Sequence, residues 1–202
     1  MELKEMIEKI QNEGIALKTK DMAQAIKMAK ETNSAELAYL IADIEETQRE
    51  RMEKIVLKAK DPRFCALYAT DIPGADVEKH KKIIFDSKNV EAICYYLSRV
   101  NASSQDIEKA FKIVVEKNDP RCAFELADSV RGVNIETLER IVRKSKDEEY
   151  IKKFMAGLEQ WNDPDVSDAQ RKKLCGLLGM ALGKQHKAML RKERPQMEEM
   201  EK

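Results

Sequence analysis

The chain has 202 residues, of which 43% are hydrophobic, 37% are charged and 5% are aromatic, a composition too apolar for a wholly disordered protein. Lysine and arginine number 37, as do aspartate and glutamate, so no net positive charge drives nonspecific binding to nucleic acid. No apolar run approaches the ~20 residues of a transmembrane helix, and four cysteines without a CxxC or Cys/His cluster (Cys65, Cys94, Cys122 and Cys175) predict reduced thiols in a cytoplasmic protein.

The first 32 residues predict a pair of helices. Apolar residues recur at helical spacing over 3–10, and Gly14 follows as a stop. Asp21 with Gln24 three residues later resembles a capping box that starts a second helix. The amphipathic start does not resemble a signal peptide. We expect residues 1–32 to form an N-terminal capping hairpin of a helical array.

From residue 33 the sequence repeats itself. The units cover 33–60, 61–88, 89–118 and 119–146, and the first half of a fifth unit returns at 147. The period is 28 residues, except for the third unit, which has 30. A fixed period in this range is typical of stacked supersecondary units, each too small to bury its apolar face alone.

Each unit contains the signals of two helices. An Asx residue opens every unit and predicts a helix N-cap, because its short side chain can accept the free N–H groups of the first turn. These residues are Asn33, Asp61, Asn89, Asp119 and Asp147, with Pro62 and Pro120 at the following position. After a short corner (Pro73-Gly74 or Arg131-Gly132), a second cap column predicts the start of the second helix at Asp76, Asp106 and Asn134.

Apolar columns at helical spacing predict the core. In the first helices they are Leu37/Cys65/Ile93/Ala123/Ile151, Leu40/Tyr68/Tyr96/Leu126/Phe154, Ile41/Ala69/Leu97/Ala127/Met155 and Ile44/Ile72/Val100/Val130/Leu158. In the second helices they are Met52/His80/Ala110/Leu138, Ile55/Ile83/Ile113/Ile141 and Val56/Ile84/Val114/Val142.

The last part of the chain departs from the repeat. We expect a long basic helix over 161–194 that closes the array, and a frayed tail over 195–202. Its cations include Arg171, Lys172, Lys173, Lys184, Lys187, Arg191 and Lys192. It could be a terminal cap with a solvated face, or it could contact phosphate, RNA or an acidic protein surface. The expected helix proper, from about 168 to 193, carries no aromatic residue to stack on bases, which weakens the nucleic-acid interpretation.

The segments DPRFCALYATDI and DPRCAFELADSV resemble HEAT-like repeats of the short variety first noted in phycobilisome lyases. Asp-Pro-Arg at 61–63 and at 119–121 carries the resemblance, which extends over 33–158. It implies a helical repeat array. Proteins of this kind are mostly protein-binding scaffolds, and some bind nucleic acid.

Two charged columns lie opposite the apolar face of the second helices, and together we name them the acid–base ladder. Their members are Glu50, Glu78, Glu108 and Glu136, followed four residues later by Lys54, Lys82, Lys112 and Arg140. Such pairs stabilise an exposed helix by ~0.2–0.5 kcal/mol each, so a purely structural role is the simpler interpretation. The functional interpretation is a charged face that a partner binds.

Two apolar columns lie away from the core stripe. Tyr39, Leu67 and Tyr95, flanked by Phe64, occupy the first helices, and Leu57, Phe85 and Val115 occupy the second helices. An exposed apolar row is unusual on a solvated face. Packing between repeats, or cover by the terminal helix, would also explain these columns. Because tyrosine is favoured at interfaces, the best candidates for a protein-binding strip are Tyr39, Leu67 and Tyr95.

No linear motif predicts catalysis, a metal site or a cofactor. His80 lies in a core column, and the glycines of CGLLGMALGK follow no strand, unlike those of nucleotide-binding loops. A pocket with converging polar groups around His80 or Tyr68 would favour an enzyme.

The sequence therefore predicts an all-α, right-handed α-solenoid of about six hairpins, with roughly 12 helices. We expect a non-enzymatic, cytoplasmic interaction module, an adaptor, scaffold or inhibitor that binds a protein partner, needs no cofactor and contacts no membrane. A composition rich in lysine and glutamate and poor in aromatic residues suits a bacterial or bacteriophage protein. The alternative is a nucleic-acid-binding solenoid that uses the Lys/Arg row of the second helices and the basic C-terminal helix.

Overall fold

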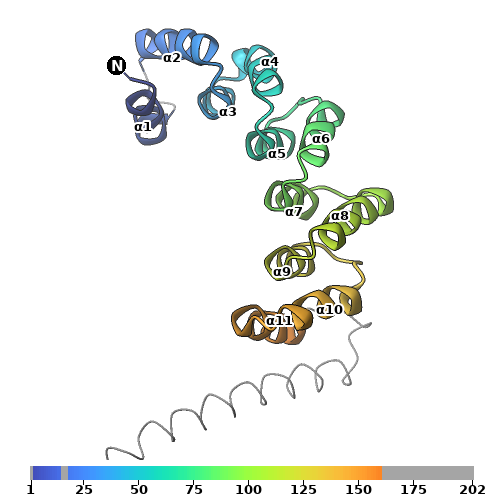
Figure 1. The fold of residues 1–202 in the computed structure, drawn as a ribbon. Coiled ribbons are helices and arrows are strands. Elements are labelled where there is room, and N and C mark those ends of the chain that lie inside the picture. The colour runs from blue at the N-terminus through green and yellow to red at the C-terminus, as the bar shows by residue number, and fades with distance from the viewer. Residues whose placement is uncertain (1, 15–17, 161–202) are drawn as a thin grey trace, which may run out of the picture. The chain divides into compact units, whose positions relative to one another are not determined.

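The computed structural model describes residues 2–14 and 18–160, and its regular structure over these residues is entirely helical (Figure 1). In chain order the helices are α1 (Leu3–Glu13), α2 (Thr19–Thr32), α3 (Ala35–Ile44), α4 (Arg49–Ala59), α5 (Pro62–Asp71), α6 (Val77–Asp86), α7 (Val90–Arg99), α8 (Ser104–Lys117), α9 (Pro120–Ser129), α10 (Ile135–Ser145) and α11 (Glu148–Gln160). A short 3-10 turn, η2 (Glu46–Gln48), precedes α4. Within the described ranges, no helix has the length and apolar character needed to cross a bilayer.

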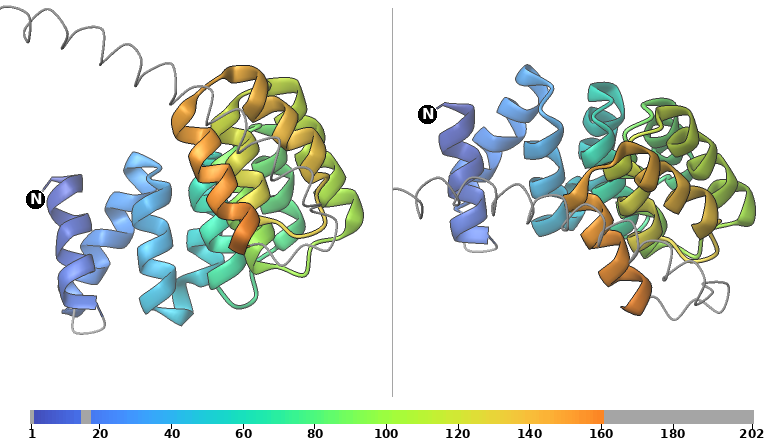
Figure 2. Two further views of the ribbon diagram at one scale, coloured as in Figure 1. Left: turned by 90° about the horizontal axis from the view of Figure 1, so that it is seen from below. Right: turned by 60° about the horizontal axis from the view of Figure 1, so that its bottom comes forward.

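The chain divides after Ala110 into two compact units. The first unit contains α1 to α7 and the beginning of α8. Its helices form hairpins, because α3 packs against α4 and α5 packs against α6. The first helices of successive hairpins, α1, α3, α5 and α7, lie side by side in that order, and α4 neighbours α6 (Figures 1 and 2). Side chains of α3, α5 and α7 can therefore meet on one surface.

The described part of the second unit contains the end of α8 and helices α9 to α11. Here α9 packs against both α10 and α11, and α10 also contacts α11. Glu139 on α10 is 2% exposed, and its Oε1 lies 3.2 Å from a terminal nitrogen of Arg143. A buried carboxylate needs such a partner, because an isolated charge is costly to remove from water.

Four of the five Asx residues are helix N-caps, as predicted. In each case the side-chain oxygen accepts a backbone N–H of the first turn. The nitrogen–oxygen distances are 2.9 Å at Asp61, 3.0 Å at Asn89, 3.0 Å at Asp119 and 3.0 Å at Asp147. Pro62 and Pro120 lie in the first turn, where the N–H that proline lacks has no partner within the helix.

The prediction for Asn33 is wrong. Asn33 ends α2 in the left-handed conformation (φ 51°), and Ser34 caps α3 by accepting the N–H of Leu37 at 3.2 Å. Asparagine tolerates this conformation better than most residues. The same positive φ recurs directly before the other four caps, at Lys60, Lys88, Asn118 and Lys146. The repeat assigned to 33–60 therefore begins one residue later than the sequence alignment indicates.

The predicted start of α8 is also corrected. Asp76 and Asn134 cap α6 and α10, but α8 begins earlier than Asp106, because the hydroxyl of Ser103 accepts the N–H of Asp106 at 3.2 Å. The repeat at 89–118 is two residues longer than the others, and its second helix, α8, starts earlier and has 14 residues.

The start predicted for α2 at Asp21 is also wrong. Asp21 does not cap α2, which begins at Thr19 after Lys18. Its carboxylate instead lies 2.6 Å from the ammonium nitrogen of Lys9. This ion pair lowers the pKa of Asp21 and raises the pKa of Lys9. Asp21 therefore ties α2 to α1.

The predicted apolar columns form the core with few exceptions. Leu126, Leu138 and Phe154 are each 0% exposed. The exceptions, which remain partly exposed, are Leu40, Ile44, Ile83, Val100 and Met155. The exposure of Leu40 and Ile44 follows from the one-residue shift of the repeat at 33–60. In that repeat Ile41, not Leu40, is equivalent to Tyr68, because the carbonyl oxygens of Ile41 and Tyr68 accept the N–H groups of the residues that end α3 and α5.

Replacing Asp61 with alanine should lower the free energy of unfolding by about 1 kcal/mol, because the first turn of α5 loses its side-chain acceptor. Urea denaturation followed by circular dichroism measures this. The matched control is Asp86→Ala, which removes an exposed carboxylate from the last residue of α6, where the helix dipole disfavours negative charge. An equal loss in both variants would contradict the capping role.

Candidate functional site: a tyrosine–aspartate cluster

One carboxylate joins three neighbouring helices of the first unit. Asp71 is the last residue of α5, and its Oδ2 accepts hydrogen bonds from the hydroxyl of Tyr39 on α3 at 3.0 Å and of Tyr95 on α7 at 3.4 Å. Both tyrosines are partly exposed. We name Tyr39, Asp71 and Tyr95 the tyrosine–aspartate cluster.

Neighbouring side chains hold the cluster in place. The hydroxyl of Thr70 donates to the other oxygen of Asp71 at 2.7 Å. The guanidinium of Arg99 lies 3.6 Å from the centre of the Tyr95 ring, a distance typical of a cation–π contact. The ring of Phe64 lies 6.2 Å from that of Tyr39, within the range of aromatic pairs. Both tyrosine rings thus have partners within the protein itself.

The surroundings of Tyr39 keep its hydroxyl protonated. Burial raises the pKa of Tyr39 well above its usual range, and the hydrogen bond to Asp71 and the charges of Asp71 and Asp43 raise it further. The Tyr39 hydroxyl therefore remains a donor at physiological pH. Its ring and hydroxyl suit molecular recognition rather than acid–base chemistry.

A hollow of about 250 Å³ lies beside the cluster, between α5 and α7. Its apolar lining comes from Ala66, Leu67, Ala92 and the ring of Tyr95, and Arg63 and Glu91 add opposite charges. This volume is below the ~300–1,000 Å³ of most small-molecule pockets, so it better suits one apolar side chain of a partner.

The structure brings together the first predicted apolar row. Tyr39, Phe64, Leu67 and Tyr95 are all partly exposed on α3, α5 and α7. Leu67 and Tyr95 line the same hollow, and the hydroxyl groups of Tyr39 and Tyr95 meet at one oxygen of Asp71. Asp71 was not among the predicted site residues. A carboxylate at the C-terminal end of a helix opposes the helix dipole, and this unfavourable placement was the available signal.

The second apolar row does not form an exposed strip. Phe85 is 2% exposed, and the ammonium of Lys109 lies 4.8 Å from the centre of its ring. Leu57 is partly exposed, and Val115, in the second unit, is 39% exposed. Phe85 is therefore a core residue and not part of an exposed strip, and the side chain of Lys109 from α8 lies over its ring.

The eight residues of the acid–base ladder are all exposed, but their pairing is irregular. Glu50 pairs with Lys54 at 2.9 Å as expected. Glu78 instead pairs at 3.0 Å with Lys81, three residues later, rather than with Lys82. Arg140 donates to the hydroxyl of Thr137 at 3.2 Å. The remaining exposed members of the ladder include Glu108, Lys112 and Glu136. Local helix contacts thus account for part of the ladder.

A second hollow, of about 450 Å³, lies near His80 and Tyr68. It is lined by Glu46, Thr47, Arg49, Glu50, Glu53, Tyr68, Ile72, Pro73, Gly74 and Ala75. The Tyr68 hydroxyl donates to the backbone carbonyl of Arg49 at 2.5 Å, and its ring stacks on His80 at 5.2 Å. Polar groups therefore converge here, which is the feature that would favour an enzyme.

The polar groups of this hollow already have structural partners. Glu53 Oε1 accepts the backbone N–H of Asp76 at 2.6 Å and lies 3.2 Å from His80 Nε2. Because a carboxylate only accepts, Nε2 of a neutral His80 must carry the proton. His80 is 0% exposed, and its Nδ1 has no hydrogen-bond partner among the described residues. This arrangement ties α4 to the start of α6.

Three of the four cysteines lie among the residues that the structure describes. Cys65 and Cys94 are buried and Cys122 is partly exposed, and all three are free. Burial raises the pKa of Cys65 to about 12 and of Cys122 to about 11, which leaves little thiolate at neutral pH. Within the described ranges, no group of three or more His, Cys, Asp or Glu side chains could hold a metal ion.

Several predictions concern residues that the structure does not describe. These are Cys175, the basic helix over 161–194 and the tail over 195–202, all of which lie outside the described residues.

Comparison with protein-family models, with curated proteins and with solved structures finds no match for this chain. The resemblance to HEAT-like repeats stays a prediction.

Proposed function

We propose that the protein is a non-enzymatic interaction module of the cytoplasm, an adaptor, scaffold or inhibitor that binds a protein partner through the tyrosine–aspartate cluster. In this proposal its hairpins stack as a right-handed, HEAT-like α-solenoid. The observation that carries the proposal is that Tyr39 and Tyr95, from different hairpins, both donate to one oxygen of Asp71 beside an apolar hollow.

Preorganisation is the physical reason for this choice. Binding normally costs free energy to order side chains at the interface, and fixed rings avoid part of this cost. Tyrosine and arginine are enriched at interfaces and among the residues that contribute most to affinity. Here Tyr39, Tyr95 and Arg99 already make contacts within the chain itself.

The test compares affinity captures from the source organism, quantified by mass spectrometry. Baits are the wild-type chain, Tyr39→Ala/Tyr95→Ala, and a charge-reversed variant, Lys82→Glu/Lys112→Glu. We expect one stoichiometric protein that resists nuclease treatment, binds the charge-reversed bait normally and binds the tyrosine variant at least ~10-fold more weakly. Tyr39→Phe/Tyr95→Phe keeps the rings and serves as a control for folding.

The opposite pattern would support the nucleic-acid alternative. In that case capture would depend on nuclease-sensitive material, would fall steeply with salt and would be lost on Lys82→Glu/Lys112→Glu. Retention of every partner by the tyrosine variant would overturn the proposed contact surface.

A further inference from the structure

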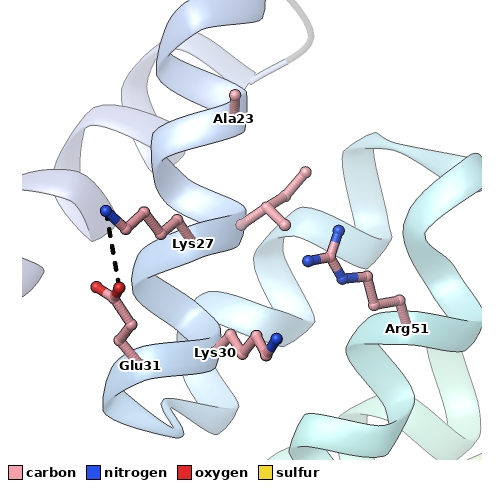
Figure 3. A pocket seen from close by; sticks show the side chains of 6 residues that line it. Ala23, Lys27, Lys30, Glu31 and Arg51 are labelled. Carbon is pink, nitrogen blue, oxygen red and sulfur yellow. Dashed lines mark ion pairs between the residues drawn. The ribbon is translucent and has the colours of Figure 1, made fainter.

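A third hollow in the first unit has a different chemistry. It lies between α2 and α4, has a volume of about 530 Å³, and is lined by Ala23, Ile26, Lys27, Lys30, Glu31 and Arg51. Figure 3 shows that Lys30 extends from α2 and Arg51 from α4 into the space between these helices. Neither helix contributes to the tyrosine–aspartate cluster, so the two surfaces are separate.

Positive charge is in excess at this hollow. Lys27 pairs with Glu31 at 3.8 Å on α2 (Figure 3). Lys30 and Arg51 are exposed and have no ion-pair partner among the described residues. The nearest acid in sequence to Arg51, Glu50, already pairs with Lys54. Two unpaired cations beside one concavity attract an anion.

The residues that line the hollow indicate which kind of anion would fit it. Ala23 and the partly exposed Ile26 give the hollow an apolar part next to the cations. The planar guanidinium of Arg51 can bind a carboxylate through two parallel hydrogen bonds. No aromatic residue lines the hollow to stack on a base. The lining therefore favours an acidic, partly apolar peptide over nucleic acid.

We propose that the hollow between α2 and α4 binds an acidic peptide segment of a protein partner. Carboxylates of the segment bind Lys30 and Arg51, and an aliphatic side chain of the segment packs on Ala23 and Ile26. The proposal does not depend on the tyrosine–aspartate cluster, since it concerns other helices and another ligand chemistry.

The test uses the full chain labelled with ¹⁵N and titrated with the capped peptide acetyl-Glu-Leu-Glu-Leu-Glu-amide, followed by amide chemical shifts. We expect saturable shifts centred on Ile26, Lys30 and Arg51. Lys30→Glu and Arg51→Glu should each weaken binding at least ~10-fold. The matched controls are Lys20→Glu and Lys58→Glu, which make the same charge change at exposed positions of α2 and α4 outside the hollow.

Three outcomes would overturn the proposal. Equal weakening in the control variants would show that diffuse charge attracts the peptide. Equal or tighter binding at these residues by inorganic phosphate or by a ten-nucleotide single strand would show that phosphate is the preferred ligand. An absence of saturable shifts at α2 and α4 would show that the hollow does not bind this peptide chemistry.

Discussion

Replacing Glu53 with alanine should lower the free energy of unfolding by about 2–6 kcal/mol, because two donors lose one acceptor. Glu53 Oε1 accepts the N–H of Asp76 at 2.6 Å, and it lies 3.2 Å from Nε2 of the fully buried His80. Each unsatisfied buried donor costs ~1–3 kcal/mol. Urea denaturation measures the total, and hydrogen exchange should localise the loss of protection to α4 and α6.

Glu50→Ala is the matched control for this prediction. Glu50 lies on the same helix, is exposed and pairs with Lys54 at 2.9 Å, so its removal should change the free energy of unfolding far less than removal of Glu53. Glu53→Gln should cost less than Glu53→Ala, because the amide oxygen can still accept the N–H of Asp76. Equal losses for Glu53→Ala and Glu50→Ala would show that the buried contacts do not stabilise the hairpins.

Helix starts and core columns were predictable because local rules determine them. Asp61 and Asp119 combine an N-cap with a following proline, a signal contained within a few residues. Leu126 and Leu138 belong to columns that recur in every unit, and both are fully buried. Periodicity predicts such positions without knowledge of which helices are neighbours.

The errors arose where two local signals competed. Asn33 can end one helix in the left-handed conformation or cap the next, and Ser34 offered the better cap after it. Ser103 likewise preceded Asp106 as an acceptor for the first turn of α8. Sequence alone ranks such neighbours poorly, because propensities for Ser, Asn and Asp at N-caps are nearly equal.

The candidate site was only half predictable. Tyr39 and Tyr95 stood out as aromatic residues on the polar side of their helices, but Asp71 lies 32 residues from one and 24 from the other. Their meeting depends on the offset between packed helices, which no linear pattern encodes. Phe85 illustrates the converse, because Lys109 from α8 covers a side chain that its own helix leaves open.

Lowering the pH below about 6.5 should destabilise the protein through His80, and His80→Gln should remove this effect. Burial lowers the pKa of His80 below its ordinary value of 6.5, although the neighbouring carboxylates of Glu53 and Asp76 raise it in part. The unfolded chain therefore binds a proton that the folded chain does not. Stability attributable to His80 is complete above the unfolded pKa and falls as pH decreases, by at most ~1.4 kcal/mol per pH unit.

Glutamine is the informative replacement because its side-chain amide can still donate to Glu53 but does not titrate. Urea denaturation of both proteins between about pH 5 and pH 7.5 gives two stability curves. Their difference isolates His80, since every other titrating group, including His186, is present in both. We expect the curves to run parallel above about pH 7 and to converge or cross as the wild type loses stability in acid. Parallel curves over the whole range would show that burial of His80 does not oppose its protonation.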